Sequence, residues 1–291
     1  MALCRHIIEA MHHHPSPDSR PEGQATRGKT APNRLRGVDH FLACYDPALM
    51  ARADGDWRDA LYVDLGYGAE PVTTLESAAR LRRLNAELPV LGVEIEPERV
   101  RRGQPFVDRR TDFRLGGFNM PLRPGESIRL VRAFNVLRQY DPDQALPACA
   151  LIMSQIRPGG LFMDGTSDPF GRTWTGMMLR RTAESWRLEA LVLGANLRAG
   201  FAAEAHQTRL PKSFIHRMVP GEGIFAFMEA WKASARETRA RAVWGPRDWF
   251  AAAGCRMVER GFRIARPDKW LRRGWLVWLN PDLTLEGPNH P

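Results

Sequence analysis

The sequence predicts an α/β fold built on a doubly wound, mostly parallel β-sheet, and three observations carry this prediction. Short apolar runs alternate with helical patterns between residues 60 and 166. The first run leads into a turn with two glycines, Gly66 and Gly68, and the second ends at an acidic residue, Glu94. Strands and helices that alternate at this pace imply right-handed crossovers and a parallel sheet with helices on both faces.

The first half of the alternation contains three predicted strands. The run ALYVDL (60–65) is of strand type, and Pro71 fits the first position of the helix that follows it. PVLGVEI (89–95) is the second strand, and Pro97 opens another helix with acidic residues in its first turn, where they are favourable. TDFRL (111–115) is a weaker third strand.

The second half continues with SIRLVRAFNVL (127–137) as the fourth strand and DPDQALPACALIMSQI (141–156) as a helix. The turn Arg157-Pro158-Gly159-Gly160 ends that helix, and LFMDGT (161–166) is the fifth strand. Towards the C-terminus, 246–255 is predicted as a helix, and 255–264 and 274–280 as two strands that pair antiparallel and give the sheet an antiparallel last strand.

These elements divide the chain into five parts. Residues 1–32 are rich in His, Pro, Ser and Gly and predict a disordered tail. Residues 33–59 predict N-terminal helices, 60–169 the ligand-binding core, and 246–291 the completion of the core sheet. Residues 170–245 interrupt the alternation, so they predict an insertion after strand five that recognises the substrate.

Composition favours a soluble cytoplasmic protein. Apolar residues make up 44% of the 291 residues, and no apolar run reaches the roughly 18 residues that span a bilayer. The four cysteines form no CxxC pair, so neither a metal site nor a disulfide framework is expected. The net charge is +9, with much of the basic excess in 171–245, which is compatible with an anionic small molecule or RNA as partner. No RNA-binding module is visible, so nucleic acid is the less favoured partner, and the oligomeric state is not readable.

The segment Val63-Asp64-Leu65-Gly66-Tyr67-Gly68-Ala69-Glu70-Pro71 carries the chemistry. A glycine turn between a strand and a helix lets a nucleoside cofactor approach the backbone at the carboxyl ends of parallel strands. A dinucleotide fingerprint would place glycine at Pro71, and the carboxylate of Asp64 would repel a pyrophosphate. A ligand with an ammonium group suits Asp64 better, and a carboxylate at Glu94, or alternatively Glu96, can accept hydrogen bonds from ribose hydroxyls.

DLGYGAEP resembles motif I of the class I S-adenosylmethionine (SAM)-dependent methyltransferases, which have a Rossmann-like fold. LGVEIEP is similar to the acidic motif of that family, and ALIMSQIRPGGLFMDGT to its helix, turn and fifth strand. The resemblance implies SAM as cofactor, with Asp64, Gly66 and Gly68 around its methionine and ribose and Glu94 on the ribose hydroxyls. It places the adenine at GGFNM, and the full set of candidate cofactor residues is Asp64, Gly66, Tyr67, Gly68, Glu94, Ile95, Phe118, Asn119 and Asn135.

The same resemblance implies transfer of the SAM methyl group to an acceptor near Asn135, which could instead stabilise the local turn. Proximity and orientation can carry such a reaction, and a general base is optional. The candidate bases are Asp168, Tyr140 and His216, for each of which a structural role is the alternative.

Two other classes of protein compete with this interpretation. An NAD(P)-dependent oxidoreductase would have a small residue at Asp64 and glycine at Pro71, and no YxxxK pair occurs among the four tyrosines. A non-catalytic binding module with the same fold would keep the cofactor pocket without turnover. The identity of the acceptor and the atom methylated are not encoded in any motif that the sequence shows.

Overall fold

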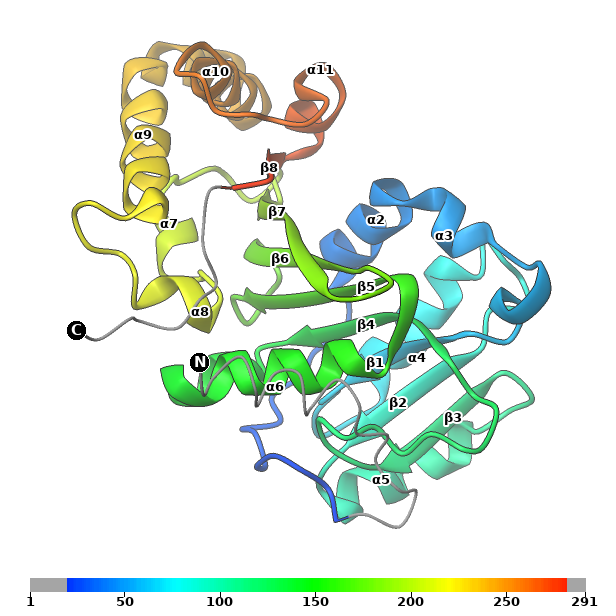
Figure 1. Cartoon of the computed structure of the whole chain (residues 1–291). Coiled ribbons are helices and arrows are strands. Elements are labelled where there is room, and N and C mark those ends of the chain that lie inside the picture. The colour runs from blue at the N-terminus through cyan, green and yellow to red at the C-terminus, as the bar shows by residue number, and fades with distance from the viewer. Residues whose placement is uncertain (1–19, 282–291) are drawn as a thin grey trace.

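One eight-stranded sheet organises the chain, in the order β3-β2-β1-β4-β5-β6-β7-β8, in a computed structural model that describes residues 20–281 (Figure 1). The strands are β1 (Leu61–Leu65), β2 (Val90–Glu94), β3 (Thr111–Leu115), β4 (Ile128–Phe134), β5 (Ile156–Ser167), β6 (Thr173–Arg181), β7 (Trp186–Ala195) and β8 (Trp275–Leu279). The longer helices are α2 (Arg36–Tyr45), α4 (Val72–Leu81), α5 (Pro97–Gly103), α6 (Pro142–Ser154), α9 (Gly223–Glu237) and α10 (Pro246–Glu259). Short helices are α3 (Pro47–Ala51), α7 (Glu204–Gln207), α8 (Lys212–Ile215) and α11 (Pro267–Trp270).

The first five strands are parallel, which confirms the predicted doubly wound, Rossmann-like sheet. β1 pairs with both β2 and β4, so the strand order reverses between β1 and β4. Ligands of open α/β sheets bind at such a switch point, outside the carboxyl ends of the strands. The fold therefore directs attention to the ends of β1 and β4, where the glycine turn and Asn135 lie.

The second half of the sheet differs from the prediction. The segments 173–181 and 186–195 do not form a separate insertion, because β6 pairs antiparallel with β5 and β7 pairs antiparallel with β6 and β8. The predicted strand at 255–264 is also wrong, since α10 continues to Glu259 and only Ile264 makes an isolated bridge to Trp278. The sheet thus ends in three antiparallel strands rather than one.

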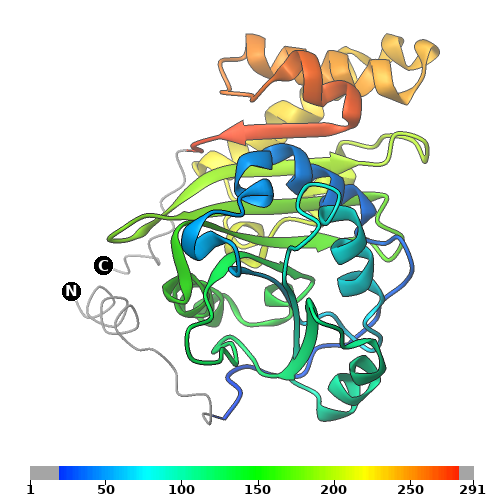
Figure 2. The same cartoon turned by 90° about the vertical axis from the view of Figure 1, so that its right-hand side faces the viewer.

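Two hydrophobic clusters cover the two faces of the sheet. One contains Val63, Val131 and Phe162 with apolar side chains of α6, α9 and α10. The other contains Tyr62 and Leu130 with side chains of α2, α3 and α4. Figure 2 shows α10 and α11 gathered beyond β8, at the opposite end of the sheet from β3. Within residues 20–281, no helix is long and apolar enough to cross a membrane.

Candidate functional site

The glycine turn after β1 has a backbone shape that glycine alone adopts easily. Gly66 and Gly68 have φ angles of +69° and +96°, which side chains disfavour. A Cβ at Gly66 would lie 2.6 Å from Cγ2 of Val136, and one at Gly68 would lie 2.8 Å from the carbonyl oxygen of Gly28. Both residues therefore leave room for backbone or side chains that approach from the end of β4 and from the N-terminal segment.

Glu94 at the end of β2 is buried and holds this turn in place. Its Oε2 accepts a hydrogen bond from the amide of Gly68 (2.9 Å), and its Oε1 accepts one from the amide of Ile95 (3.0 Å). Arg99 of α5 adds an ion pair at 3.3 Å. The amide of the second glycine thus points at a carboxylate, and a pyrophosphate brought to it would meet a negative charge.

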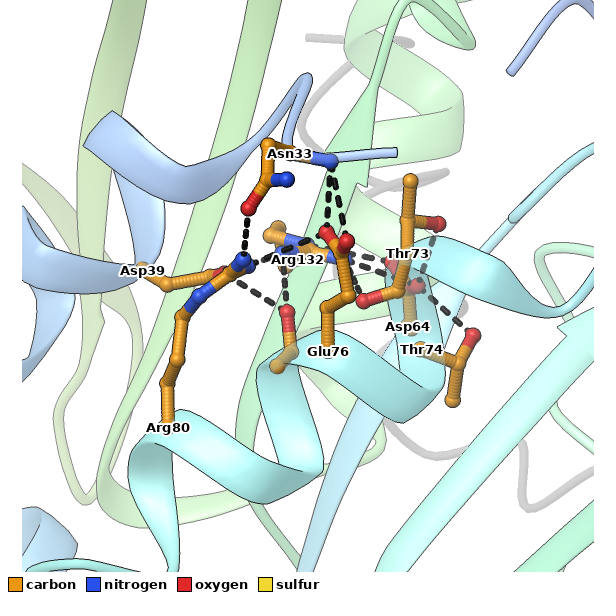
Figure 3. A network of polar contacts seen from close by, with 9 residues as sticks. Asn33, Asp39, Asp64, Thr73, Thr74, Glu76, Arg80 and Arg132 are labelled. Carbon is orange, nitrogen blue, oxygen red and sulfur yellow. Dashed lines mark hydrogen bonds and ion pairs between the residues drawn. The ribbon is translucent and has the colours of Figure 1, made fainter. Parts of the chain in front are cut away.

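Asp64 at the end of β1 belongs to a buried ionic network between the sheet and helices α2 and α4 (Figure 3). Arg132 of β4 reaches both oxygens of Asp64, with Nε 3.1 Å from Oδ1 and Nη2 2.8 Å from Oδ2, and also pairs with Asp39. The hydroxyls of Thr73 and Thr74 donate to Oδ2 of Asp64. Burial alone would lower the pKa of Arg132, but Asp64 and Asp39 raise it above its usual range.

The pairing leaves Asp64 with limited capacity for a ligand. Within residues 20–281, its Oδ1 accepts from Nε of Arg132 alone, so one lone pair of that oxygen remains. Asp64 also lines a cavity, which brings a ligand bound there close to this carboxylate. Asp64 therefore has two roles open to it, one in the network and one towards the cavity.

A cavity of about 810 Å³ lies at the switch point. Of the candidate residues, Asp64, Gly66, Tyr67, Gly68 and Asn135 line it, together with residues 24–30, the start of α2 and the ends of β4 and β5. The other candidates do not line it, namely Glu94, Ile95, Phe118, Asn119, Tyr140, Asp168 and His216. This volume falls within the range of small-molecule sites.

Residues 20–30, which we call the strap, lie across the site and not in a disordered tail. Asn119 donates to the carbonyl of Arg20 (2.9 Å) and accepts from the amide of Glu22 (2.6 Å). The amide of Phe118 donates to the carbonyl of Glu22, and the amide of Ala69 to that of Gly28, both at 2.8 Å. The prediction of disorder is thus wrong for residues 20–32, while residues 1–19 lie outside the described part of the chain.

The strap also engages Tyr140 and Arg99. The hydroxyl of Tyr140 accepts from the amide of Gln24 (2.6 Å) and donates to its carbonyl (3.1 Å). Arg99 donates to the carbonyl of Thr26 (2.8 Å). The strap therefore covers Phe118, Asn119, Tyr140 and the residues next to Glu94, which include most of the positions expected around an adenosine.

The remaining candidates have structural partners. Asp168 accepts from the amides of Phe170, Arg172 and Thr173, so it stabilises a turn. His216 follows α8 and is exposed outside the cavity. Asn135 has a φ of +61° and cross-links the ends of β4 and β5, since its Oδ1 accepts from the amide of Ser167 (3.0 Å) and its Nδ2 donates to that residue's hydroxyl (3.2 Å).

Several cavity residues had no signal in the sequence. These are Arg34, Arg138, Thr166, Ser167 and Arg209, together with Arg27 and Lys29 of the strap. Arg138 and Ser167 lie close in sequence to Asn135 and Asp168, so proximity to those candidates could have pointed to them. Arg34 and Arg209 come from the N-terminal segment and the loop after α7, and only the fold brings them to the ends of β4 and β5.

Two buried titratable side chains lie on the elements behind the cavity. Burial raises the pKa of Asp164 on β5 from 3.8 to about 7, and its Oδ2 has no partner among the described residues. Burial lowers the pKa of His206 on α7 from 6.5 to about 4. Asp164 therefore lowers the free energy of unfolding as the pH rises from about 4 to 7. His206 lowers it as the pH falls from about 6.5 to 4.

We expect Asp164→Asn to remove the pH-dependent destabilisation that the buried carboxylate causes. The ionised carboxylate costs about 4 kcal/mol at pH 7 and above, from a shift of about three pKa units at 1.36 kcal/mol each. The difference in unfolding free energy between variant and wild type should therefore move in the variant's favour by about 2–3 kcal/mol from pH 5 to pH 8. Urea unfolding at the two pH values measures it, and a difference independent of pH would contradict the assignment.

No protein-family model matches the sequence, and the search of curated proteins gave no match. Among solved structures, the chain is similar to a SAM-dependent methyltransferase from Clostridium acetobutylicum, with 9% identity over 55% of this chain and 65% of the other, at a TM-score of 0.33. The plantazolicin methyltransferase BpumL matches with 7% identity over 47% of each chain and a TM-score of 0.35. A cyclopropane synthase from Mycobacterium tuberculosis matches with 15% identity over 43% of this chain and 42% of the other, at a TM-score of 0.30. The chain thus spans less than two thirds of each of these proteins.

Proposed function

We propose that the protein is a SAM-dependent methyltransferase whose acceptor is a small molecule bound over the ends of β4 and β5. The observation that carries the proposal is the turn at Gly66 and Gly68, which lines the cavity. The amide of Gly68 in this turn donates a hydrogen bond to Glu94. The turn occurs in the motif that resembles motif I and at the switch point of the sheet, where a nucleoside cofactor is expected.

The donor set fits SAM better than a dinucleotide. Asp64 lines the cavity, and its Oδ1 keeps one lone pair that could accept from the ammonium group of the cofactor's methionine part. The amide of Gly68 could otherwise bind a phosphate, but it donates to the carboxylate of Glu94. This arrangement disfavours NAD and NADP. Ribose hydroxyls would share or replace the bonds that Glu94 now accepts from Gly68 and Ile95.

SAM supplies a methyl group on a sulfonium, and its transfer to a lone pair of the acceptor breaks the carbon–sulfur bond, with the electron pair left on sulfur as S-adenosylhomocysteine forms. A hydroxyl or amine acceptor also loses a proton, which would pass to water. Among the described residues that line the cavity, Asp64 is the one carboxylate and none is histidine or cysteine. Asn135 and Ser167 fix the ends of β4 and β5 against each other, so the acceptor would be held and oriented rather than deprotonated.

The test of the cofactor is a calorimetric titration of the full chain with SAM and S-adenosylhomocysteine, with NAD and NADP as controls. We expect both SAM compounds to bind and Glu94→Gln to weaken them at least about tenfold, because a neutral amide loses the charge-assisted bonds to the ribose and the turn. Glu96→Gln is the matched control, since the side chain of Glu96 is partly exposed and, within residues 20–281, forms no hydrogen bond or ion pair with the turn.

Binding of NAD with no binding of SAM would make the chain an oxidoreductase and end the proposal. Equal affinities in wild type and Glu94→Gln would remove Glu94 from the cofactor site. SAM binding with no methyl transfer to any small molecule in an acceptor screen would favour the non-catalytic module instead.

A further inference from the structure

The cavity is lined by five cationic side chains and one carboxylate. The cations are Arg27, Lys29, Arg34, Arg138 and Arg209, and the carboxylate is that of Asp64, which Arg132 already pairs from behind. The cavity thus carries a net positive charge before any ligand enters. SAM would bring a sulfonium and an ammonium against one carboxylate, so the cofactor adds to this charge rather than neutralising it.

Arg34 holds a fixed guanidinium at the wall of the cavity. It donates to the hydroxyl of Ser167 (3.2 Å), to the carbonyl of Asp168 (3.1 Å) and to the carbonyl of Lys29 (2.6 Å). All of these acceptors are neutral oxygens, as is the carbonyl of Ser167 that Nη2 reaches at 3.3 Å, and within residues 20–281 this guanidinium forms no ion pair. Its position is therefore set by the strap and by the end of β5, and its nearest negative charge, that of Asp168, acts on it without a direct ion pair.

Arg209 reaches the same place from the loop after α7. Thr175 of β6 donates to its carbonyl, which ties its backbone to the sheet. Its side chain is half-buried, lines the cavity, and forms no ion pair in the described part of the chain. Burial and, to a lesser degree, the charge of Arg209 lower the pKa of Arg34, against the opposing influence of Asp168, so the two guanidinium groups are near enough to repel each other.

A buried hydroxyl lies in the wall of the cavity beside these cations. Thr166 of β5 lines the cavity, is 5% exposed, and has a buried hydroxyl without a partner among the described residues. A buried hydroxyl without a partner costs free energy unless a ligand satisfies it. Nε of Arg138, at the end of β4, is likewise buried and without a partner in the described residues.

We propose that this part of the cavity binds an anionic group of the methyl acceptor, a carboxylate or a phosphate, between Arg34 and Arg209. Planar guanidinium groups bind both kinds of anion through paired hydrogen bonds. The anion would neutralise the repulsion between the two arginines and offset the positive charge of the cofactor. This inference rests on the proposed methyltransferase function, because it assigns the group to the acceptor.

The experiment uses inorganic phosphate and acetate as probes of the full chain, at an ionic strength held constant with sodium chloride. Phosphate is followed by phosphorus NMR and acetate by calorimetry. We expect one of them to bind saturably at one site, and the tighter of the two identifies the acceptor's anionic group. Arg209→Gln should weaken that binding at least about tenfold. Arg198 is exposed and lies outside the cavity, so Arg198→Gln should not change the binding.

The same titrations are repeated with saturating S-adenosylhomocysteine. Anion binding that persists supports an acceptor subsite, whereas competition would assign the arginines to the cofactor's own carboxylate and overturn the inference. Unsaturable binding, or equal binding by Arg209→Gln and wild type, would also overturn it while leaving SAM binding intact. If SAM fails to bind but the anion still does, the proposed function fails and the subsite remains as an anion site of another ligand.

Discussion

Replacing Arg132 by methionine is expected to lower the free energy of unfolding by about 3–5 kcal/mol, the usual cost of removing one partner of a buried ion pair. Arg132 is fully buried and is the ionic partner of both Asp64 and Asp39. Methionine fills much of its volume but leaves Asp64 with only two threonine hydroxyls. Equilibrium unfolding in urea, at neutral pH, measures the loss.

The control for this prediction is Arg80→Met in the same network. Arg80 pairs with Asp39 at 2.6 Å and with Glu76 at 3.2 Å, but its side chain is partly exposed, and Asp39 would keep Arg132. We expect a loss of about 1 kcal/mol for this variant. Comparable losses for the two arginines would mean that the network behaves as a solvated surface cluster and not as a buried one.

The network also changes how Asp64 can be tested. Asp64→Ala would leave Arg132 without its two-point partner, so any loss of SAM binding in that variant would mix cofactor affinity with stability. Glu94→Gln is the cleaner probe, because the amide keeps one acceptor for the turn at Gly68. Even so, its unfolding free energy has to be measured beside its affinity.

The parallel half of the sheet could be predicted because its signals are local. The apolar runs at β1, β2 and β4, the helix-opening prolines Pro71 and Pro97, and the glycine turn each depend on a few adjacent residues. Strand order and the switch point then follow from βαβ handedness. The residues of the site that belong to these signals, Asp64, Gly66, Gly68 and Asn135, lie at the cavity as a group.

The second half of the sheet departs from the prediction because the interactions that place its strands are not local. Residues 173–181 and 186–195 break the alternation of strands and helices, and no local pattern in them indicates that they extend the core sheet beyond β5. In α10, Phe250, Ala253 and Met257 keep helical spacing, but the residues after Cys255 also fit the short strand that the sequence predicts there. Arg34 and Arg209 had no local pattern at all.

The strap is the largest departure from expectation, and its physical reason lies in its backbone. Its composition predicts disorder because it has little apolar surface to bury. Order comes instead from hydrogen bonds between its peptide groups and Asn119, Tyr140, Ala69 and Arg99. These partners exist only once the sheet has formed, so composition alone does not reveal them.

Deleting residues 1–30 is expected to tighten SAM binding at least about tenfold. The strap bonds to the amide of Phe118 and to Asn119, the groups assigned to the adenine by resemblance. SAM therefore binds only the fraction of molecules in which the strap has left, and the apparent dissociation constant rises in inverse proportion to that fraction. Removing the strap raises the fraction to one, and calorimetry with SAM and S-adenosylhomocysteine reads the change directly.

Deletion of residues 1–19 alone is the matched control, since it shortens the chain and keeps every strap contact described above. We expect its affinity for SAM to equal that of the full chain, so that the gain maps to residues 20–30. Loss of SAM binding in the longer deletion, with unfolding free energy unchanged, would reverse the interpretation. The strap would then be a wall of the cofactor site, with Gly28 and Thr26 closing over the ligand instead of competing with it.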